Sequence, residues 1–158
     1  MNGDGPSAIG GVPLHALLVE DSDDDALLIE QLAESSKVDV QMDRVNNGEA
    51  AIAYLQMRAT NDHGSGIPHF VLLDLSLPRV GGIEILRRIK SDPRLQDIPV
   101  IILSGTENEE EIRIGQDLRA HTHIVKPISA TEFVWIVQSI QNYWPRIERL
   151  RGLTQVAG

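Results

Sequence analysis

The chain contains no cysteine. A disulfide framework, a thiolate metal site and a thiol nucleophile are therefore excluded, and so are redox enzymes of the CxxC type. Basic residues are also scarce, because 14 Lys and Arg stand against 23 Asp and Glu and give a formal net charge of -9. A negative field of this size repels phosphate backbones and anionic lipid. We therefore expect no direct nucleic-acid partner.

Long hydrophobic runs are missing as well. Apolar runs such as residues 100–103 fall far short of the ~18 residues that a membrane-spanning helix requires. The first 13 residues carry no Lys or Arg ahead of an apolar stretch, as a signal peptide would. We expect a cytoplasmic protein that does not insert into a membrane, and the lack of cysteine fits a reducing compartment.

The length and the composition are those of one globular domain. The chain has 158 residues, of which 42% are hydrophobic and 23% are charged. A chain of this size buries enough surface to form a core without a metal or disulfide staple. We divide it into a flexible N-terminal segment (1–13), one domain (14–144) and a C-terminal extension (145–158).

Strand and helix patterns alternate along the domain. Short apolar or alternating segments predict strands at 16–19, 38–45, 70–73, 100–103 and 123–125, and a helical pattern follows each of them. Continuous apolar strands belong to parallel sheets that are covered on both faces. The sequence therefore predicts an α/β fold of the (βα)5 type, with a doubly wound, parallel, five-stranded sheet.

Polar residues follow four of the predicted strands directly. They are Glu20 and Asp21 after the first strand, Asp74 after the third, Ser104 and Gly105 after the fourth, and Lys126 after the fifth. In an open parallel sheet the ligand lies beyond the carboxyl ends of the strands, so these residues form the candidate site.

The acids of this set suit a metal ion. Crowded carboxylates repel one another, which raises their pKa values unless a cation neutralises them. Oxygen ligands from Asp21 and Asp74, with Glu20 as a further candidate, favour Mg²⁺. Lys126 adds a point charge that can pair with Asp74 or with a phosphoryl group, and Ser104 adds a hydroxyl donor.

Four motifs carry a resemblance to a known family. They are LLVEDSDDD (17–25), VLLDLSLP (71–78) followed by Gly82, IPVIILSG (98–105) and VKP (125–127). In this order, the motifs resemble the receiver domain of two-component response regulators, which has a flavodoxin-like fold. The resemblance covers residues 14–144. The loop at 60–68 and the spacing between the later motifs are most similar to single-domain regulators that accompany phytochrome-type sensor kinases.

The resemblance implies that Asp74 accepts a phosphoryl group from a histidine kinase or a phosphotransfer protein. Glu20, Asp21 and Asp74, with the backbone carbonyl of Ser76, would hold Mg²⁺. The chain would then be a single-domain response regulator of a phosphorelay, which signals by phosphorylation-dependent protein binding. Its only chemistry would be self-phosphorylation and autodephosphorylation.

Three further residues receive roles from the resemblance. Ser104, Lys126 and the Gly105 N–H would neutralise charge on the phosphoryl oxygens. The Lys126-Pro127 peptide bond would be cis. The sequence departs from the family at His123, where Tyr or Phe is usual, and at Arg119-Ala120, where Gly-Ala is usual. His123 is therefore a candidate switch residue together with Ser104.

Other interpretations remain open. A haloacid dehalogenase-like phosphohydrolase also uses an aspartyl phosphate, but it carries its nucleophile in a DxD motif after the first strand. A flavodoxin-like cofactor binder would need a Ser/Thr-rich phosphate loop at that place. Glu20 could orient its neighbours instead of binding metal, and Asp23, Asp24 and Asp25 favour a helix N-terminus.

The C-terminal region suggests self-association. Trp135 and Tyr143 lie off the inward stripe of the last helix, and Ile147, Leu150 and Leu153 form an apolar row at spacings of three. We expect a homodimer through this region, whereas the alternative is a frayed tail.

Overall fold

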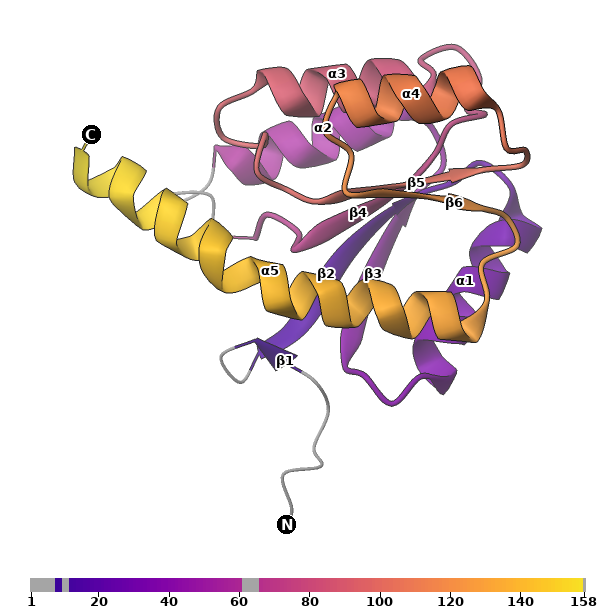
Figure 1. Ribbon diagram of the computed structural model, residues 1–158, viewed down its shortest axis with the longest axis horizontal. Helices are drawn as coiled ribbons and strands as arrows, with labels where there is room; N and C mark the ends of the chain where they lie inside the picture. Colours follow the sequence, from indigo (N-terminus) through magenta and orange to yellow (C-terminus); the bar gives the residue numbers. More distant parts are fainter. Residues whose placement is uncertain (1–7, 10–11, 61–65, 158) are drawn as a thin grey trace.

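Five parallel strands form the centre of the molecule. The computed structural model describes the backbone of residues 8–9, 12–60 and 66–157, and the side chains of residues 14–60 and 66–146. Within these residues the parallel strands are β2 (Val12–Val19), β3 (Val40–Val45), β4 (Phe70–Asp74), β5 (Val100–Ser104) and β6 (Thr122–Val125). Their order across the sheet is β3-β2-β4-β5-β6 (Figure 1). The predicted parallel five-stranded sheet is confirmed.

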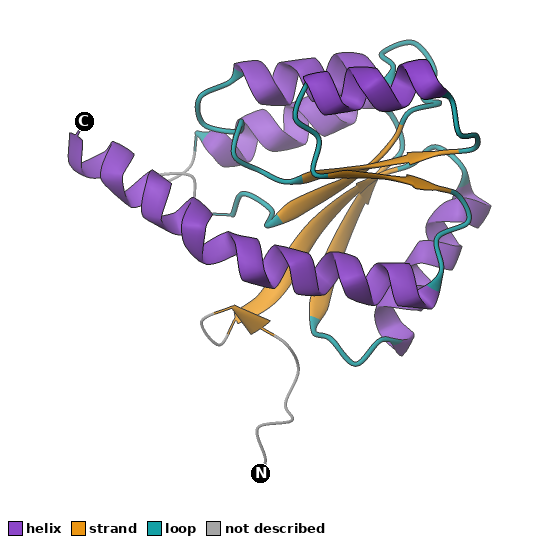
Figure 2. Cartoon of the chain, in the orientation of Figure 1, coloured by secondary structure: helices purple, strands orange, loops and turns teal. Residues whose placement is uncertain are grey.

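Helices cover both faces of this sheet. They are α1 (Asp23–Ser35), α2 (Gly48–Ala59), α3 (Gly82–Ser91), α4 (Glu109–Asp117) and α5 (Ala130–Ala157). Figure 2 shows α2, α3 and α4 on one side of the strands and α1 and α5 on the other. The doubly wound arrangement follows from the sequence, because strands that are apolar along their whole length must be covered twice.

The core has two halves, one on each face. Leu17 and Val19 of β2 belong to the half that α2 and α3 cover with Leu55 and Ile85. The other half contains the intervening residues of β2 and apolar residues of α1 and α5: Leu14, Ala16, Leu18, Ala26, Ile29, Phe133, Ile136 and Ile140. All five residues of β4 and of β5 are buried, as a central strand between two helical layers requires.

Polar side chains cap the first turns of α1 and α2. The Ser22 hydroxyl accepts a hydrogen bond of 3.2 Å from the Asp25 backbone N–H and caps α1. Asn47 caps α2 in the same way, through a 2.8 Å bond from the Ala50 N–H. Because Ser22 directly follows Glu20 and Asp21, α1 begins immediately beside the predicted acidic site.

The N-terminal boundary differs from the predicted one. A two-residue strand, β1 (Ala8–Ile9), pairs antiparallel with the start of β2, which begins at Val12. The expected flexible segment 1–13 therefore includes strand residues, and its boundary falls within β2. Backbone pairing with a neighbouring strand supplies the order here, because two residues are too few for a sequence period. Residues 1–7 and 10–11 lie outside the described part.

The last helix is longer than expected. α5 continues through Pro145 to Ala157, although proline cannot donate the hydrogen bond of a helix interior. The backbone is thus helical across the predicted boundary at 145. The side chains of Ile147, Leu150 and Leu153 lie outside the described residues. In the part of the chain that the structure describes, no helix combines the length and the apolar character needed to cross a membrane.

Candidate functional site

Three carboxylates meet at the carboxyl edge of the sheet. Val19 lies opposite Leu73 in the parallel register of β2 and β4, so the residues that follow them become neighbours. Glu20 is 0% exposed and Asp74 is 1% exposed, whereas Asp21 faces solvent. One ligand atom from each of Glu20, Asp21 and Asp74 lies within 4.8 Å of the others. The structure therefore brings together the three acids that the sequence predicted.

The electrostatics of this cluster fit a cation. Burial, together with a hydrogen bond to Asp74 and the charge of Asp74, raises the pKa of Glu20 to about 7. Two buried carboxylates at this distance hold excess negative charge that a proton or a metal ion must offset. An all-oxygen set with one exposed member suits a hard divalent ion that keeps several waters.

Lys126 reaches the cluster from the end of β6. Its ammonium nitrogen lies 2.9 Å from Asp25 Oδ2, 3.3 Å from Glu20 Oε1 and 3.6 Å from Asp74 Oδ1. Burial alone would lower the pKa of Lys126, but the Asp25 hydrogen bond and the two buried carboxylates raise it above its ordinary value. Lys126 is therefore a fixed positive charge. The peptide bond between Lys126 and Pro127 is cis, as the family resemblance implied.

Two contacts to this site were not foreseen from the sequence. Asp25 was interpreted only as an acid that favours the helix N-terminus, yet it makes the shortest contact with Lys126. Arg44 of β3 donates hydrogen bonds of 3.1 and 2.8 Å to the Glu20 carbonyl and one of 2.9 Å to Asp23 Oδ1. In the sequence, the only indication that Asp25 could reach the site is its position four residues after Asp21. Arg44 offered none.

The backbone around Asp74 is tightly packed. The Ser76 N–H donates a 3.0 Å hydrogen bond to Asp74 Oδ1, which orients the carboxylate. A Cβ atom on Gly82 would lie 2.6 Å from the Asp74 carbonyl oxygen and 2.7 Å from Leu75 Cα. Only glycine fits there without displacing backbone, so α3 begins directly against the end of β4. The role of the Ser76 carbonyl as a metal ligand stays a prediction.

Ser104 and His123 are in direct contact. The buried Ser104 hydroxyl donates a 2.7 Å hydrogen bond to the Thr106 carbonyl and lies 3.1 Å from His123 Nε2. A serine hydroxyl has one proton, so the second bond needs His123 Nε2 as the donor. Gly105, which lies between Ser104 and Thr106 in the sequence, is exposed.

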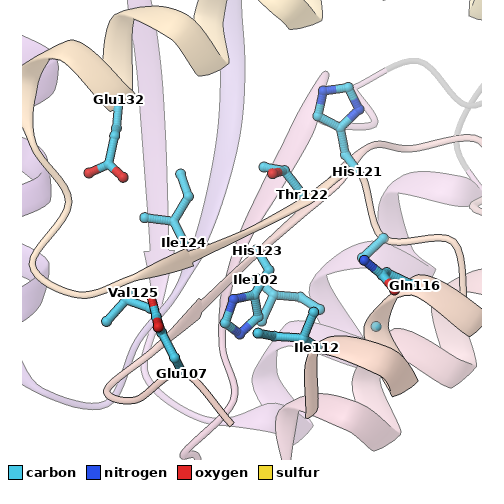
Figure 3. A pocket seen from close by; sticks show the side chains of 12 residues that line it. Ile102, Glu107, Ile112, Gln116, His121, Thr122, His123, Ile124, Val125 and Glu132 are labelled. Carbon is cyan, nitrogen blue, oxygen red and sulfur yellow. The ribbon is translucent and has the colours of Figure 1, made fainter. Parts of the chain in front are cut away.

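His123 also lines a groove of about 470 Å³ beside α4 and β6. Figure 3 shows its ring beside Ile112, with Glu107 and Glu132 at other parts of the groove. His121 lines the same groove and contacts the Ser139 hydroxyl at 3.1 Å. Among the described residues, the acidic cluster is the one group able to hold a metal ion, so the two histidines do not form a second site.

Comparisons with known proteins agree with this geometry. A model of the response regulator receiver domain family matches residues 16–138. Response regulator Rcp1 of Synechocystis is 33% identical over 132 residues, which cover 84% of this chain and 89% of Rcp1.

Solved structures give the same result. The crystal structure of the Mn²⁺-bound form of Rcp1 superposes with a TM-score of 0.67 at 33% identity, over 84% of this chain and 94% of that one. The phosphorylated cyanobacterial phytochrome response regulator RcpA has a TM-score of 0.69 at 35% identity, with the same two coverages. The haloacid dehalogenase-like alternative receives no support from these matches.

Proposed function

Because this chain belongs to the family of response regulator receiver domains, we propose that Asp74 is the residue that accepts the phosphoryl group. Members of the family interact with histidine kinases or phosphotransfer proteins, and phosphorylation-dependent signalling is the function of this chain. One observation carries the assignment of Asp74. Its side chain is 2% exposed at the end of β4, yet its carboxylate lies 3.6 Å from the Lys126 ammonium and within the acidic cluster.

In the proposed transfer, an Asp74 oxygen attacks phosphorus in line with the leaving group. The new bond is an acyl phosphate, and the bond between phosphorus and the donor's histidine nitrogen breaks, with its electron pair staying on that nitrogen. Lys126, the Ser104 hydroxyl and the Gly105 N–H neutralise the phosphoryl oxygens. Water later cleaves the acyl phosphate, so the only chemistry is self-phosphorylation and autodephosphorylation.

Receiver domains bind Mg²⁺ or Mn²⁺ at an acidic pocket, and this chain has such a pocket. We propose Mg²⁺ as the resident ion, with Glu20, Asp21, Asp74 and the Ser76 carbonyl as its protein ligands. The ion supplies positive charge beside the phosphoryl oxygens when it is bound. Asp21 is the exposed member, so we expect Asp21→Ala to cost more Mg²⁺ affinity than Glu20→Ala in a calorimetric titration.

Intact-mass measurement tests the acceptor. The chain, incubated with Mg²⁺ and acetyl phosphate, should gain one phosphoryl group, and Asp74→Asn should gain none. Asp24→Asn, at an exposed acid of the first turn of α1, is the matched control and should label like the unaltered chain. Labelling of Asp74→Asn would overturn the assignment. Hydrolysis of a phosphate ester would instead favour a phosphohydrolase.

The proposal extends to His123 and to the quaternary state. Ser104 would leave the Thr106 carbonyl for the phosphoryl group, and the His123 ring would follow its hydroxyl.

A homodimer through the C-terminal region is supported by Trp135, which is 51% exposed on α5. Sedimentation of the chain beside Trp135→Ala and Leu150→Glu tests this, because a monomer at ~100 μM would exclude even weak pairing.

We propose that the chain does not bind nucleic acid directly and that it acts in the cytoplasm. The net charge of -9 argues against direct binding of nucleic acid. A cytoplasmic location is part of the proposal, since the donor kinase must reach Asp74 there. Cell fractionation with an antibody against the chain tests the location.

A further inference from the structure

The lysine of the site is held by a residue that the transfer does not use. Lys126 Nζ lies 2.9 Å from Asp25 Oδ2 and 3.6 Å from Asp74 Oδ1. The backbone of Asp25 is anchored at the start of α1, because its N–H donates a hydrogen bond to the Ser22 cap. The closest partner of the Lys126 ammonium is thus Asp25 of α1, and Asp74, the proposed acceptor, is the most distant of its three acidic partners.

We propose that Asp25 is a positioning residue that holds the Lys126 ammonium in the unphosphorylated state and competes with the phosphoryl group for it. The inference rests on the proposed role of Asp74 as phosphoryl acceptor. It assigns to α1 a part in deciding how readily the phosphorylated state forms.

The charges at the site give the direction of this competition. A phosphoryl group on Asp74 carries close to two negative charges and three acceptor oxygens, whereas Asp25 offers one charge. In the proposed exchange, Lys126 keeps its contact with Glu20 and moves from Asp25, 2.9 Å away, towards the phosphoryl group on Asp74, whose Oδ1 is now 3.6 Å away. Because this exchange breaks the ion pair between Asp25 and Lys126, the free energy of that ion pair opposes phosphoryl binding.

The exposure of the two partners limits the size of the effect. The Asp25 side chain is 43% exposed and that of Lys126 is 18% exposed. Water solvates Asp25 once the lysine leaves, so the contact is that of a partly exposed ion pair. Pairs of this kind change an equilibrium by a factor of about two to five.

Beryllofluoride, a phosphoryl mimic, tests the proposal in the presence of Mg²⁺. We expect Asp25→Asn to bind it about two to five times more tightly than Asp24→Asn, measured by titration of amide signals in NMR spectra. Asp24 belongs to the same helical turn and is exposed, so its variant has the same change in net charge. Asp25→Glu, which keeps the carboxylate, should stay near the unaltered chain.

Equal affinities of the two asparagine variants would overturn the competition, and so would weaker binding by Asp25→Asn. If the unaltered chain failed to bind beryllofluoride at all, the proposed function itself would fall. The two failures are therefore distinguishable.

A second measurement needs no metal ion. In urea unfolding of the metal-free protein, Asp25→Asn and Lys126→Gln should show a coupling in a double-mutant cycle, whereas Asp24→Asn and Lys126→Gln should show none. A coupling equal to that of the Asp24 control would contradict the contact on which the proposal depends.

Discussion

The Ser104 hydroxyl oxygen lies 3.1 Å from Nε2 of His123, and its own proton is donated to the Thr106 carbonyl. The histidine ring is thereby joined to the serine by a hydrogen bond, which an aromatic hydrocarbon ring at this position could not make. A change in the Ser104 rotamer must therefore either break this hydrogen bond or move the His123 ring with the hydroxyl. The two strands β5 and β6 are linked at that point.

His123→Phe tests this link. We expect the rate of Asp74 phosphorylation by acetyl phosphate to stay within about twofold, because the ring does not contact the acidic cluster in any described interaction. The change of α4 amide NMR signals on addition of beryllofluoride should become smaller, since Ser104 and the ring would no longer move together. An unaltered α4 response would show that His123 is a bystander.

Glu20→Gln should stabilise the metal-free protein at alkaline pH. The pKa of Glu20 is raised to about 7, so the folded state binds more protons than the unfolded state between about pH 4.5 and 7, and stability falls as pH rises through this window. The free-energy cost of ionising the buried group reaches roughly 1–3 kcal/mol above the window. Urea unfolding at pH 5 and pH 8 should show a gain for Glu20→Gln that is larger at pH 8. A gain independent of pH would contradict this account.

Metal affinity should depend on pH for the same reason. The ion must displace a proton from Glu20 below about pH 7, so affinity for Mg²⁺ should rise between pH 6 and pH 8. Calorimetry at the two values measures the rise. In Glu20→Gln the dependence should flatten, and an equally steep dependence in that variant would assign the proton to another group.

Gly82→Ala should be strongly destabilising. The added Cβ would meet the Asp74 carbonyl and the Leu75 backbone at under 3 Å, and neither can move without shifting the end of β4. We expect a loss of roughly 1–3 kcal/mol in urea unfolding. Gly81→Ala is the matched control, because nothing lies within 4 Å of the corresponding Cβ. Similar losses in both variants would show that the close approach is not the cause.

Arg119→Gly should stabilise the chain. Arg119 has a φ of 63°, in the left-handed region that favours glycine. Its charge also lies close enough to Lys90 to help burial lower the pKa of that lysine to about 8. We expect a gain of about 0.5–1 kcal/mol. Arg113→Gly, at an exposed position inside α4, should instead cost about 1 kcal/mol. A loss in both variants would refute the strain at Arg119.

The sequence predicted the sheet, and it predicted that Glu20, Asp21, Asp74 and Lys126 lie together, because both depend on local patterns. An apolar run that stops at Asp74 or at Glu20 marks a strand end, and the parallel sheet brings such ends together. The contact of Asp25 with Lys126 could not be predicted, since it joins residues 101 positions apart. β1 was missed because Ala8 and Ile9 are too short for a period, and the length of α5 was missed because Pro145 usually ends a helix.

The site draws its side chains from four separate strand ends, and the contact between Lys126 and Glu20 spans 106 positions of the chain. Each strand must be paired in register before the residues at positions 20, 74, 104 and 126 can meet. A chain that is only partly folded therefore lacks the arrangement of side chains on which the proposed phosphoryl transfer depends.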